Sequence, residues 1–216
     1  SEPRHIEQNV PGSFGWTYPK PAQLSGEDGR FYLFWRGGNG RPVLALSDDG
    51  EEWVMGGVFA ETGGRRPYLL IASNGVDEIH IVYTDAHPEE KPRNGIYYLK
   101  YRDAAFYRAD GSKICDIWDL PVTPADCDTV YDGESSGRGW LWDIAFDDAG
   151  SPVIAYTVFP KEDDHRYRYA RWGKDGWLTT ELTDAGAAFP RKGYGVSREA
   201  YYSGGIVIDR NDPGAV

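Results

Sequence analysis

Residues 26–53 read GEDGRFYLFWRGGNGRPVLALSDDGEEW. Two apolar runs, 31–36 and 42–47, are separated by a Gly-Gly-Asn-Gly turn and bounded by Asp-Gly turns on both sides. Short apolar and aromatic runs between such turn residues are typical of β-strands. The stretch therefore predicts a β-hairpin that is preceded by one turn and followed by another.

The same pattern of turn residues and apolar runs recurs twice further along the chain. The second copy passes from SNG at 73–75 through IHIVYT at 79–84 to AFY at 105–107, and the third from DDAG at 147–150 through VIAYT at 153–157 to GWL at 176–178. A further strand is predicted before each copy, at 18–24, 67–72 and 141–146. Four antiparallel strands per repeat, at intervals of roughly 40–50 residues, indicate the blades of a β-propeller. A β-sandwich would give short strands without repeating the same turn residues.

The predicted fold is therefore all-β, a β-propeller of four-stranded antiparallel blades. The chain 1–216 is predicted to be a single propeller segment, with blades at about 16–60, 64–110 and 139–183 and the start of a fourth, with a strand at 202–208, at 200–216. An insertion at about 110–138 lies between the second and third blades. With 27 Gly and 14 Pro in the chain, we expect no helix longer than about two turns. An open stack would expose apolar faces, so we expect the remaining blades on missing sequence or on another chain.

Composition excludes several partners. The formal net charge is −11, and an acidic surface repels the phosphate backbone, so nucleic acid is not expected as a partner. No run of 18 apolar residues occurs, so we expect no membrane-spanning helix. The histidines are scattered, so we predict no metal site, and no cofactor is expected. Cys115 and Cys127 fall in the insertion, where a disulfide and two free thiols are both compatible with their spacing.

Five segments carry a resemblance to a known family: RPY at 66–68, YTDAHP at 83–88, IYY at 96–98 continuing to YRDAAFYRADG at 101–111, HRYRYARW at 165–172, and YYSGG at 201–205. In them the chain resembles the BNR-repeat-containing family, a sialidase-like propeller group that includes lyases acting on ulvan and on rhamnose–glucuronic acid linkages. The resemblance implies a seven-bladed propeller, of which this chain would supply about half, and a secreted or periplasmic protein. SDDGEEW at 47–53 is similar to a sialidase Asp-box one residue short, a structural turn.

The resemblance also implies catalytic residues. His87 falls on the family's catalytic histidine, Tyr156 near its catalytic tyrosine, and Arg168 on its arginine, with Arg166 as a competing assignment. Tyr98 stands where several members have a second histidine. Each residue has a structural alternative: His87 as a loop stabiliser, Tyr156 as a core residue, and both arginines on a solvated outer strand.

The blade topology gathers these residues on one face. Loops between the second and third strands lie on the same face as loops entering the first strand, so we expect His87 in a solvent-accessible groove there. The predicted substrate-binding residues are Arg66, Asp85, Tyr98, Arg166, Tyr201 and Tyr202. Because the protein is acidic, an anionic polysaccharide or oligosaccharide would need local arginines, which bind carboxylates bidentately.

Three functions remain open. The first is a polysaccharide lyase that cleaves a uronic-acid-containing glycan by β-elimination, with His or Tyr transferring protons and Arg neutralising the carboxylate. The second is a glycoside hydrolase, which usually needs two carboxylates across the scissile bond; Asp85 and Asp143 are the candidates. The third is a non-catalytic glycan-binding propeller. Fold alone does not choose among them.

Overall fold

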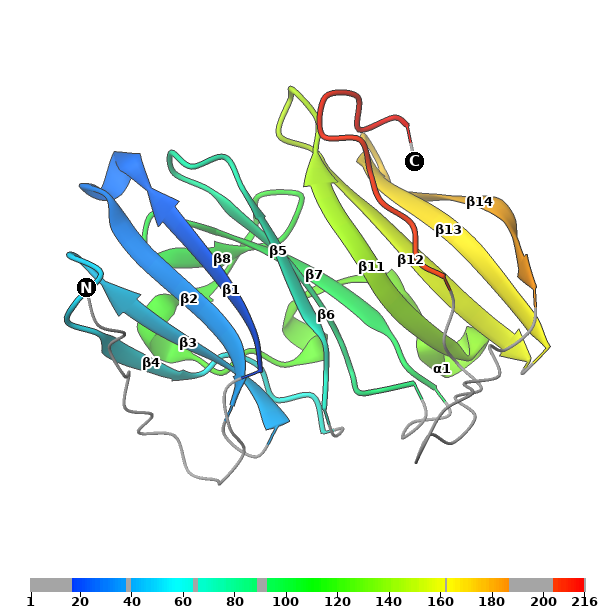
Figure 1. Cartoon of the computed structure of the whole chain (residues 1–216), viewed down its shortest axis with the longest axis horizontal. Helices are drawn as coiled ribbons and strands as arrows, with labels where there is room; N and C mark the ends of the chain where they lie inside the picture. The colour runs from blue at the N-terminus through cyan, green and yellow to red at the C-terminus, as the bar shows by residue number, and fades with distance from the viewer. Residues whose placement is uncertain are drawn as a thin grey trace.

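The computed structural model describes residues 17–37, 40–63, 66–88, 93–161, 163–186 and 204–215. These residues form three antiparallel sheets that stand side by side (Figure 1). The first sheet follows chain order, with β1 (Thr17–Leu24), β2 (Arg30–Gly37), β3 (Arg41–Ser47) and β4 (Val54–Val58). The third sheet does the same, with β11 (Arg138–Phe146), β12 (Pro152–Lys161), β13 (Asp164–Gly173) and β14 (Gly176–Gly186). The predicted all-β, four-stranded antiparallel pattern is confirmed in these two sheets.

The second sheet differs from this pattern in its outer part. It contains β5 (Leu69–Ser73), β6 (Ile79–Thr84), β7 (Ile96–Arg102), β8 (Ala105–Tyr107), β9 (Lys113–Asp116) and β10 (Asp128–Tyr131). Two short strands pair with the same edge of β7. β8 pairs with the last three residues of β7, and β10 pairs with its first three. Residues 108–127, here called the strap, lie between these two pieces. The predicted place of the insertion was therefore wrong: it interrupts the fourth strand of the second sheet, which extends to Tyr131 rather than to about 110.

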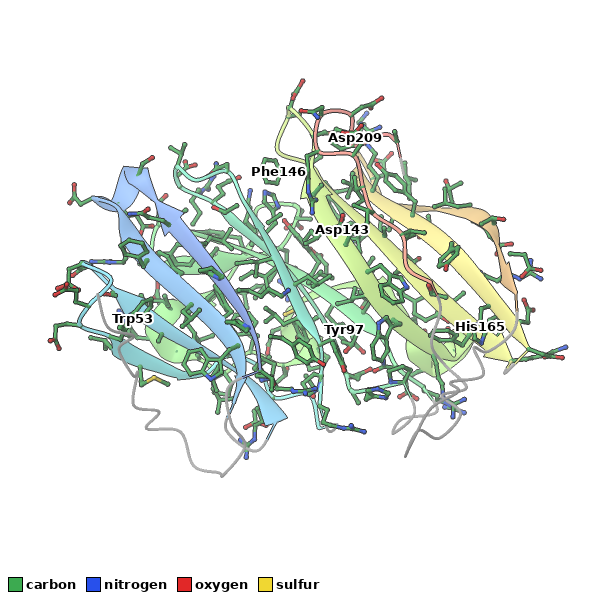
Figure 2. All side chains as sticks on the ribbon, in the orientation of Figure 1. Trp53, Tyr97, Asp143, Phe146, His165 and Asp209 are labelled. Carbon is green, nitrogen blue, oxygen red and sulfur yellow. The ribbon has the colours of Figure 1, made fainter. Side chains whose placement is uncertain are left out.

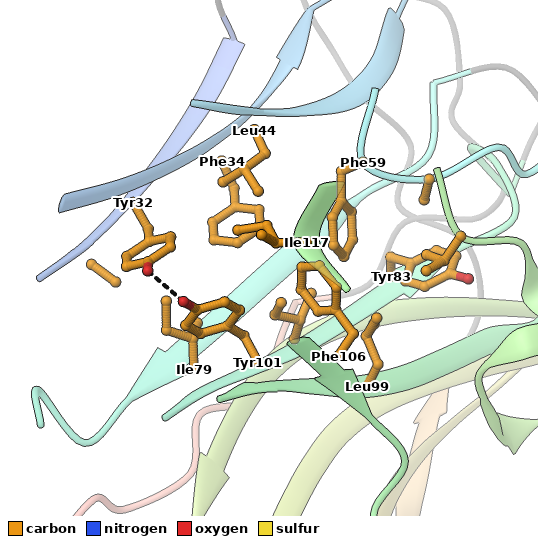
Figure 3. Close-up of a cluster of buried hydrophobic side chains, with 14 of the residues drawn as sticks. Tyr32, Phe34, Leu44, Phe59, Ile79, Tyr83, Leu99, Tyr101, Phe106 and Ile117 are labelled. Atoms are coloured by element: carbon orange, nitrogen blue, oxygen red, sulfur yellow. Dashed lines mark hydrogen bonds between the residues drawn. The ribbon is translucent and has the colours of Figure 1, made fainter. Parts of the chain in front are cut away.

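The strap closes the seam between the first and second sheets. Ile117 is buried among Phe34, Phe59 and Phe106, as Figure 3 shows. The backbone N–H of Val122 donates to Phe59 O at 3.0 Å, and Val122 O accepts from the N–H of Glu61 at 2.9 Å. The strap is thus joined both to the core and to the segment that leaves the first sheet.

The two cysteines lie on this strap and are free thiols. Cys127 is buried and accepts a hydrogen bond from the Tyr83 hydroxyl at 3.3 Å. Burial raises the pKa of the Cys127 thiol to about 12 and also raises the pKa of Cys115. Of the two alternatives for this pair, the structure has the unbridged one.

Apolar side chains fill the seams between the sheets. Every residue of β6 is buried, because this strand lies in the middle sheet with a neighbouring sheet on each side. In the first seam Phe59 packs edge-on against Phe34, Tyr83 and Phe106, with ring centroids 5.4, 6.3 and 5.5 Å apart. The hydroxyls of Tyr32 and Tyr101 meet across the same seam at 2.5 Å (Figure 3).

The end of the described chain differs from the prediction. Residues 204–215 form no strand, although a strand was predicted at 202–208, of which 202 and 203 lie outside the described residues. Ile206 and Ile208 instead pack on the outer side of the third sheet, and the N–H of Ile208 donates to Asp143 Oδ2 at 2.9 Å. A segment counts as a strand only when its backbone pairs with a neighbouring strand, and residues 204–215 pair with none among the described residues. The three sheets do not close into a ring.

Helices are short throughout the part of the chain that is described. The α-helix there is α1 (Gly133–Ser136), of four residues, and the others are single 3₁₀ turns. The expectation of no helix longer than two turns is confirmed for these residues. None of these helices has the length and apolarity needed to cross a membrane.

A buried histidine lies in the seam between the second and third sheets. His80 Nδ1 is 2.7 Å from the Tyr98 hydroxyl, and its ring stacks on Phe146 at 4.7 Å. Burial, helped by the charge of Lys100, lowers the pKa of His80 to about 3. Glu78 lies 3.7 Å from Nε2 but also 2.8 Å from Lys100 Nζ, so the imidazole is neutral at pH 7 and the carboxylate pairs with the lysine.

Phe59→Ala is expected to lower the free energy of unfolding by about 3–5 kcal/mol, because it removes a fully buried ring from the first seam. Urea denaturation of the 216-residue chain measures it. Leu182→Ala, on the exposed outer strand β14, should change the same quantity by no more than about 0.5 kcal/mol. Equal effects from the two substitutions would contradict the seam packing.

The stability of the chain should fall as the pH drops from about 6.5 towards 3. In the unfolded chain a histidine binds a proton near pH 6.5, whereas folded His80 does so only near pH 3. His80 therefore causes no loss of stability above pH 6.5. Below that pH it lowers the free energy of unfolding by up to about 1.4 kcal/mol per pH unit. His80→Asn removes this titration, so urea denaturation across pH should show the wild-type and variant curves converging on acidification; parallel curves would refute the assignment.

Candidate functional site

The innermost strand of each sheet is the first in chain order, namely β1, β5 and β11. These three strands begin on one face of the protein, here called the loop face. Tyr18 on β1, Tyr68 just before β5 and Trp140 on β11 meet there. The Tyr18 and Tyr68 ring centroids are 5.4 Å apart, and those of Tyr68 and Trp140 are 4.5 Å apart. These three side chains form a continuous aromatic row across the sheets.

A cation and an imidazole flank this aromatic row. The Arg36 guanidinium lies 4.8 Å from the Tyr18 ring centroid and 5.4 Å from that of Tyr68, and its Nε donates to Thr17 Oγ1 at 3.1 Å. The His87 ring lies 5.9 Å from Tyr68 and 4.8 Å from Trp140. Cation–π contact holds the arginine in place, so Tyr68 links a fixed positive charge to the histidine.

His87 is only 4% exposed. The expectation of a solvent-accessible groove around it was therefore wrong. Its place in the loop after β6 was used to predict exposure, but the rings of Tyr68 and Trp140 pack against it. Aromatic neighbours from the starts of two other strands were not visible in the local sequence around His87.

The loop that carries His87 is fixed at both ends. Thr84 Oγ1 accepts from the Tyr68 N–H at 3.0 Å and donates to Ala86 O at 2.9 Å. At the far end, Asn94 Oδ1 accepts from the Ala86 N–H and Asn94 Nδ2 donates to Gly139 O, both at 2.8 Å. These bonds tie the loop to the starts of β5 and β11, where Tyr68 and Trp140 lie.

Asn94 lies in a pocket that only small neighbours allow. The residue is fully buried, and a Cβ on Gly133 would clash with its backbone. A Cβ on Gly139 would approach Asn94 O to 3.0 Å. The loop face therefore depends on glycine at both positions, which lie against the Asn94 backbone.

Asp85, a predicted substrate-binding residue, supports the same loop. Its Oδ2 accepts from the Gly95 N–H at 2.7 Å and from the Tyr97 hydroxyl at 3.1 Å. Burial and the nearby Asp85 charge raise the pKa of Tyr97. The 5% exposed Asp85 carboxylate is thus used inside the protein, and the structure does not support substrate binding by it.

Tyr98 is also placed away from any surface. It is fully buried in the second seam, with its hydroxyl on His80 and its ring 5.2 Å from Trp177. Burial raises its pKa well above the usual value. Its assignment as a substrate-binding residue was wrong, because the alternation of β7 turns this side chain towards the third sheet.

Tyr156, Arg168 and Arg166 form a separate group in the third sheet. Tyr156 is fully buried, pairs with Arg168 across the strands, and donates to Thr179 Oγ1 at 3.5 Å. Burial raises the pKa of Tyr156, while its hydrogen bond to Thr179 and the nearby charge of Arg168 lower it by less. Arg168 lies 3.5 Å from Glu181, while Arg166 pairs with Asp164 and Glu181. These arginines are therefore neutralised by acidic neighbours.

Arg66 lies on the segment that leads into β5, half-buried and with a φ of 56°. Tyr201 and Tyr202 lie outside the described residues. Arg138 adds a further cation on the loop face, where its Nε donates to Pro88 O at 2.7 Å, directly after His87. Within the described ranges, no three His, Cys, Asp or Glu side chains are grouped to hold a metal ion.

The chain matches the BNR repeat-containing family over residues 6–185. It belongs to this family. Among solved structures, it is similar to a polysaccharide lyase of family PL25, an ulvan lyase, bound to -[GlcA(1-4)Rha3S]-, with a TM-score of 0.60, 17% identity, and 76% of this chain and 43% of that chain covered. A second structure of a PL25 ulvan lyase gives a TM-score of 0.60, 17% identity, and 82% and 44% coverage.

These matches show a shared fold, and this BNR repeat-containing chain spans less than half the length of the lyases it matches. An α-L-arabinofuranosidase from Podospora anserina in complex with cellotriose has 10% identity, covers 82% of this chain and 52% of its own, and has a TM-score of 0.40. That score is too low to indicate a common arrangement. No curated protein matches the sequence.

Sequence reasoning missed Arg36 and the aromatic row of this BNR repeat-containing protein. The repeat contained a signal for the row. Leu33, Ile81 and Ala155, at the centres of the three copies, pair with Pro21, Ile71 and Asp143, and Tyr18, Tyr68 and Trp140 each lie three residues before those partners. Aligning the copies by predicted strand register would have placed three aromatic residues at one equivalent position. Arg36 had no comparable signal.

Asn94→Ala is expected to lower the free energy of unfolding by about 1–3 kcal/mol, because it leaves the buried Ala86 N–H and Gly139 O without partners. Urea denaturation measures this change. Asn211→Ala, which truncates an exposed asparagine near the end of the chain, serves as the matched control and should have little effect. If both variants were equally stable, Asn94 would not be fixing the loop.

Proposed function

We propose that this chain is part of a carbohydrate-active propeller that cleaves a uronic-acid-containing glycan by β-elimination. One observation carries the proposal: Arg36 and His87 lie on either side of Tyr68, on the face where the three innermost strands begin. The arrangement offers a fixed positive charge and a proton-transfer group a short distance apart. The resemblance of the structure to ulvan lyases supports the same class of reaction.

The reaction assigns each group a role. The His87 imidazole takes the proton from the carbon next to the uronate carboxylate, the electron pair forms a carbon–carbon double bond, the bond to the leaving glycosidic oxygen breaks, and the imidazolium returns the proton to that oxygen. A cation at the carboxylate lowers the cost of the negative charge that develops on that carbon. Because Tyr68 and Trp140 cover the imidazole, the proposal requires one of these rings to move when substrate binds.

Arg36 is the arginine best suited to hold the carboxylate. Among the described residues it has no acidic side chain within ion-pair distance, whereas Arg168 lies near Glu181 and Arg166 lies near three acids. A guanidinium without a carboxylate partner keeps its positive charge available to a substrate carboxylate. Tyr156 is fully buried in the core between the second and third sheets, so the proposal gives it no contact with substrate on the loop face.

The two carboxylates considered for the hydrolase alternative, Asp85 and Asp143, are held at different places in the described part of the chain. Asp85 is bound within the loop of the second sheet by Gly95 and Tyr97. Asp143 accepts hydrogen bonds from the Ile208 N–H and from Arg210 Nη2 on the outer side of the third sheet. Figure 2 shows Tyr97 and Asp143 at separate places on the molecule. The two acids therefore do not face a common bond, and this favours the lyase.

The substrate proposed is an anionic polysaccharide or oligosaccharide. The similar ulvan lyase was solved with -[GlcA(1-4)Rha3S]-, which contains such a uronate. A secreted or periplasmic location would give access to this polymer. Since the chain spans less than half of the similar lyases, we also propose that further blades, on missing sequence or on another chain, complete the propeller.

The test is the absorbance of the unsaturated uronate, which only a lyase produces. With the complete propeller and a glucuronate–rhamnose glycan, His87→Ala should reduce turnover by about 10²–10⁴-fold, the usual contribution of a general base. Arg36→Ala should reduce kcat/KM, while Arg171→Ala, an exposed arginine on the outer part of the third sheet, should not. Cleavage without absorbance would show a hydrolase, and wild-type turnover by the His87 variant would overturn the assignment.

A further inference from the structure

A groove lies on the face opposite the loop face. It has a volume of about 380 Å³, and its walls include Arg30, Asp48, Asp49, Glu52, Val54 and Trp118. One wall is the turn at 47–53 between β3 and β4, and the other is the strap. The groove is within the size range of small-molecule sites, about 300–1,000 Å³.

Trp118 projects from a fixed part of the strap. The preceding residue, Ile117, is buried in the first seam, and its N–H donates to Ala104 O at 2.9 Å, in the turn between β7 and β8. That turn is at the other end of the sheet from His87, because β7 runs from one face to the other. Val122 pairs with the segment after β4, so the backbone is held on both sides of Trp118.

The indole itself takes no part in this packing, since Trp118 is 66% exposed. Ile117 and Val122 already supply the buried side of the strap, and folding does not require a large aromatic ring at the next position. Val54, on the opposite wall, is also exposed. Exposed apolar side chains gathered at one concave place are a feature of binding sites.

The acidic wall is equally fixed. Asp49 Oδ1 accepts from the N–H groups of Glu51 at 2.7 Å and Glu52 at 2.8 Å. Ser47 Oγ accepts from the Gly50 N–H at 2.8 Å, and Arg30 Nε pairs with Asp48 at 2.7 Å. Both walls therefore stand in place before a ligand arrives, which reduces the entropy lost on binding.

The charges of the groove select the ligand. Asp48, Asp49 and Glu52 face a single cation, Arg30, which Asp48 already neutralises. The remaining negative charge repels a carboxylate or a sulfate, whereas carboxylates accept hydrogen bonds from hydroxyl groups. The flat indole offers a surface for the C–H face of a sugar ring. This combination suits a polyhydroxylated ligand without charge.

We propose that this groove binds a neutral saccharide, with one sugar ring stacked on Trp118 and its hydroxyls donating to the acidic turn. The inference rests on the proposed function for the carbohydrate class of the ligand. It adds a second site with the opposite charge preference: the loop face takes the uronate, and this groove takes uncharged sugar units.

The experiment titrates the 216-residue chain with cellohexaose and xylohexaose and follows the indole N–H signals by NMR. The Trp118 signal, assigned by its loss in Trp118→Ala, should shift, and that substitution should weaken binding by about tenfold, as truncation of a central binding tryptophan typically does. Leu178→Ala, which removes an equally exposed apolar side chain on β14, should leave the affinity unchanged. Neither sugar contains a uronate, so the result is independent of lyase activity.

Three results would overturn the proposal. The first is no shift of the Trp118 signal with either neutral hexasaccharide at millimolar concentration. The second is a stronger shift with hexagalacturonate, which would show that the groove accepts anions. The third is a stronger shift with hexalysine, which would show a cation site. A tenfold loss in Trp118→Ala with unchanged binding in Leu178→Ala supports it.

Discussion

The structure depends on the packing of β-sheets whose two faces are both apolar. The middle sheet shows this most clearly, because every side chain of β6 is buried and no face of that strand is available for solvent. A sheet of this kind is stable only when it is covered on both sides. The first and third sheets provide that cover, and the strap completes it where Ile117 enters the first seam.

This packing decides where chemistry is possible. Side chains in the middle of the strands are buried in the seams between sheets, as Tyr98 and Tyr156 are. Functional groups can therefore reach a ligand only from the strand ends and loops. At the loop face the starts of three innermost strands bring Tyr18, Tyr68 and Trp140 together although they come from three repeats. The site therefore follows from the register of the repeat and not from any single motif.

The same distinction explains how much could be predicted from the sequence. Strand positions and the antiparallel pattern followed from local composition and turn residues. The split outer strand of the second sheet did not, because the pairing of β10 with β7 joins segments separated by the strap. The burial of His87 was missed for a similar reason: its cover comes from Tyr68 and Trp140, which are distant in sequence. Residues whose environment is set by other repeats were the ones misassigned.

Charge balance gives the last constraint on function. The proposed action on an acidic polymer would require this acidic chain to keep some cations free of its own carboxylates. Arg166 and Arg168 of the third sheet do not meet this requirement, since Glu181 lies beside both. Arg36 meets the requirement differently, because aromatic rings and the Thr17 hydroxyl hold its guanidinium without cancelling its charge. Aromatic support thus allows the loop face to keep a positive charge that an ion pair would neutralise, and His87 packs against one of those same rings.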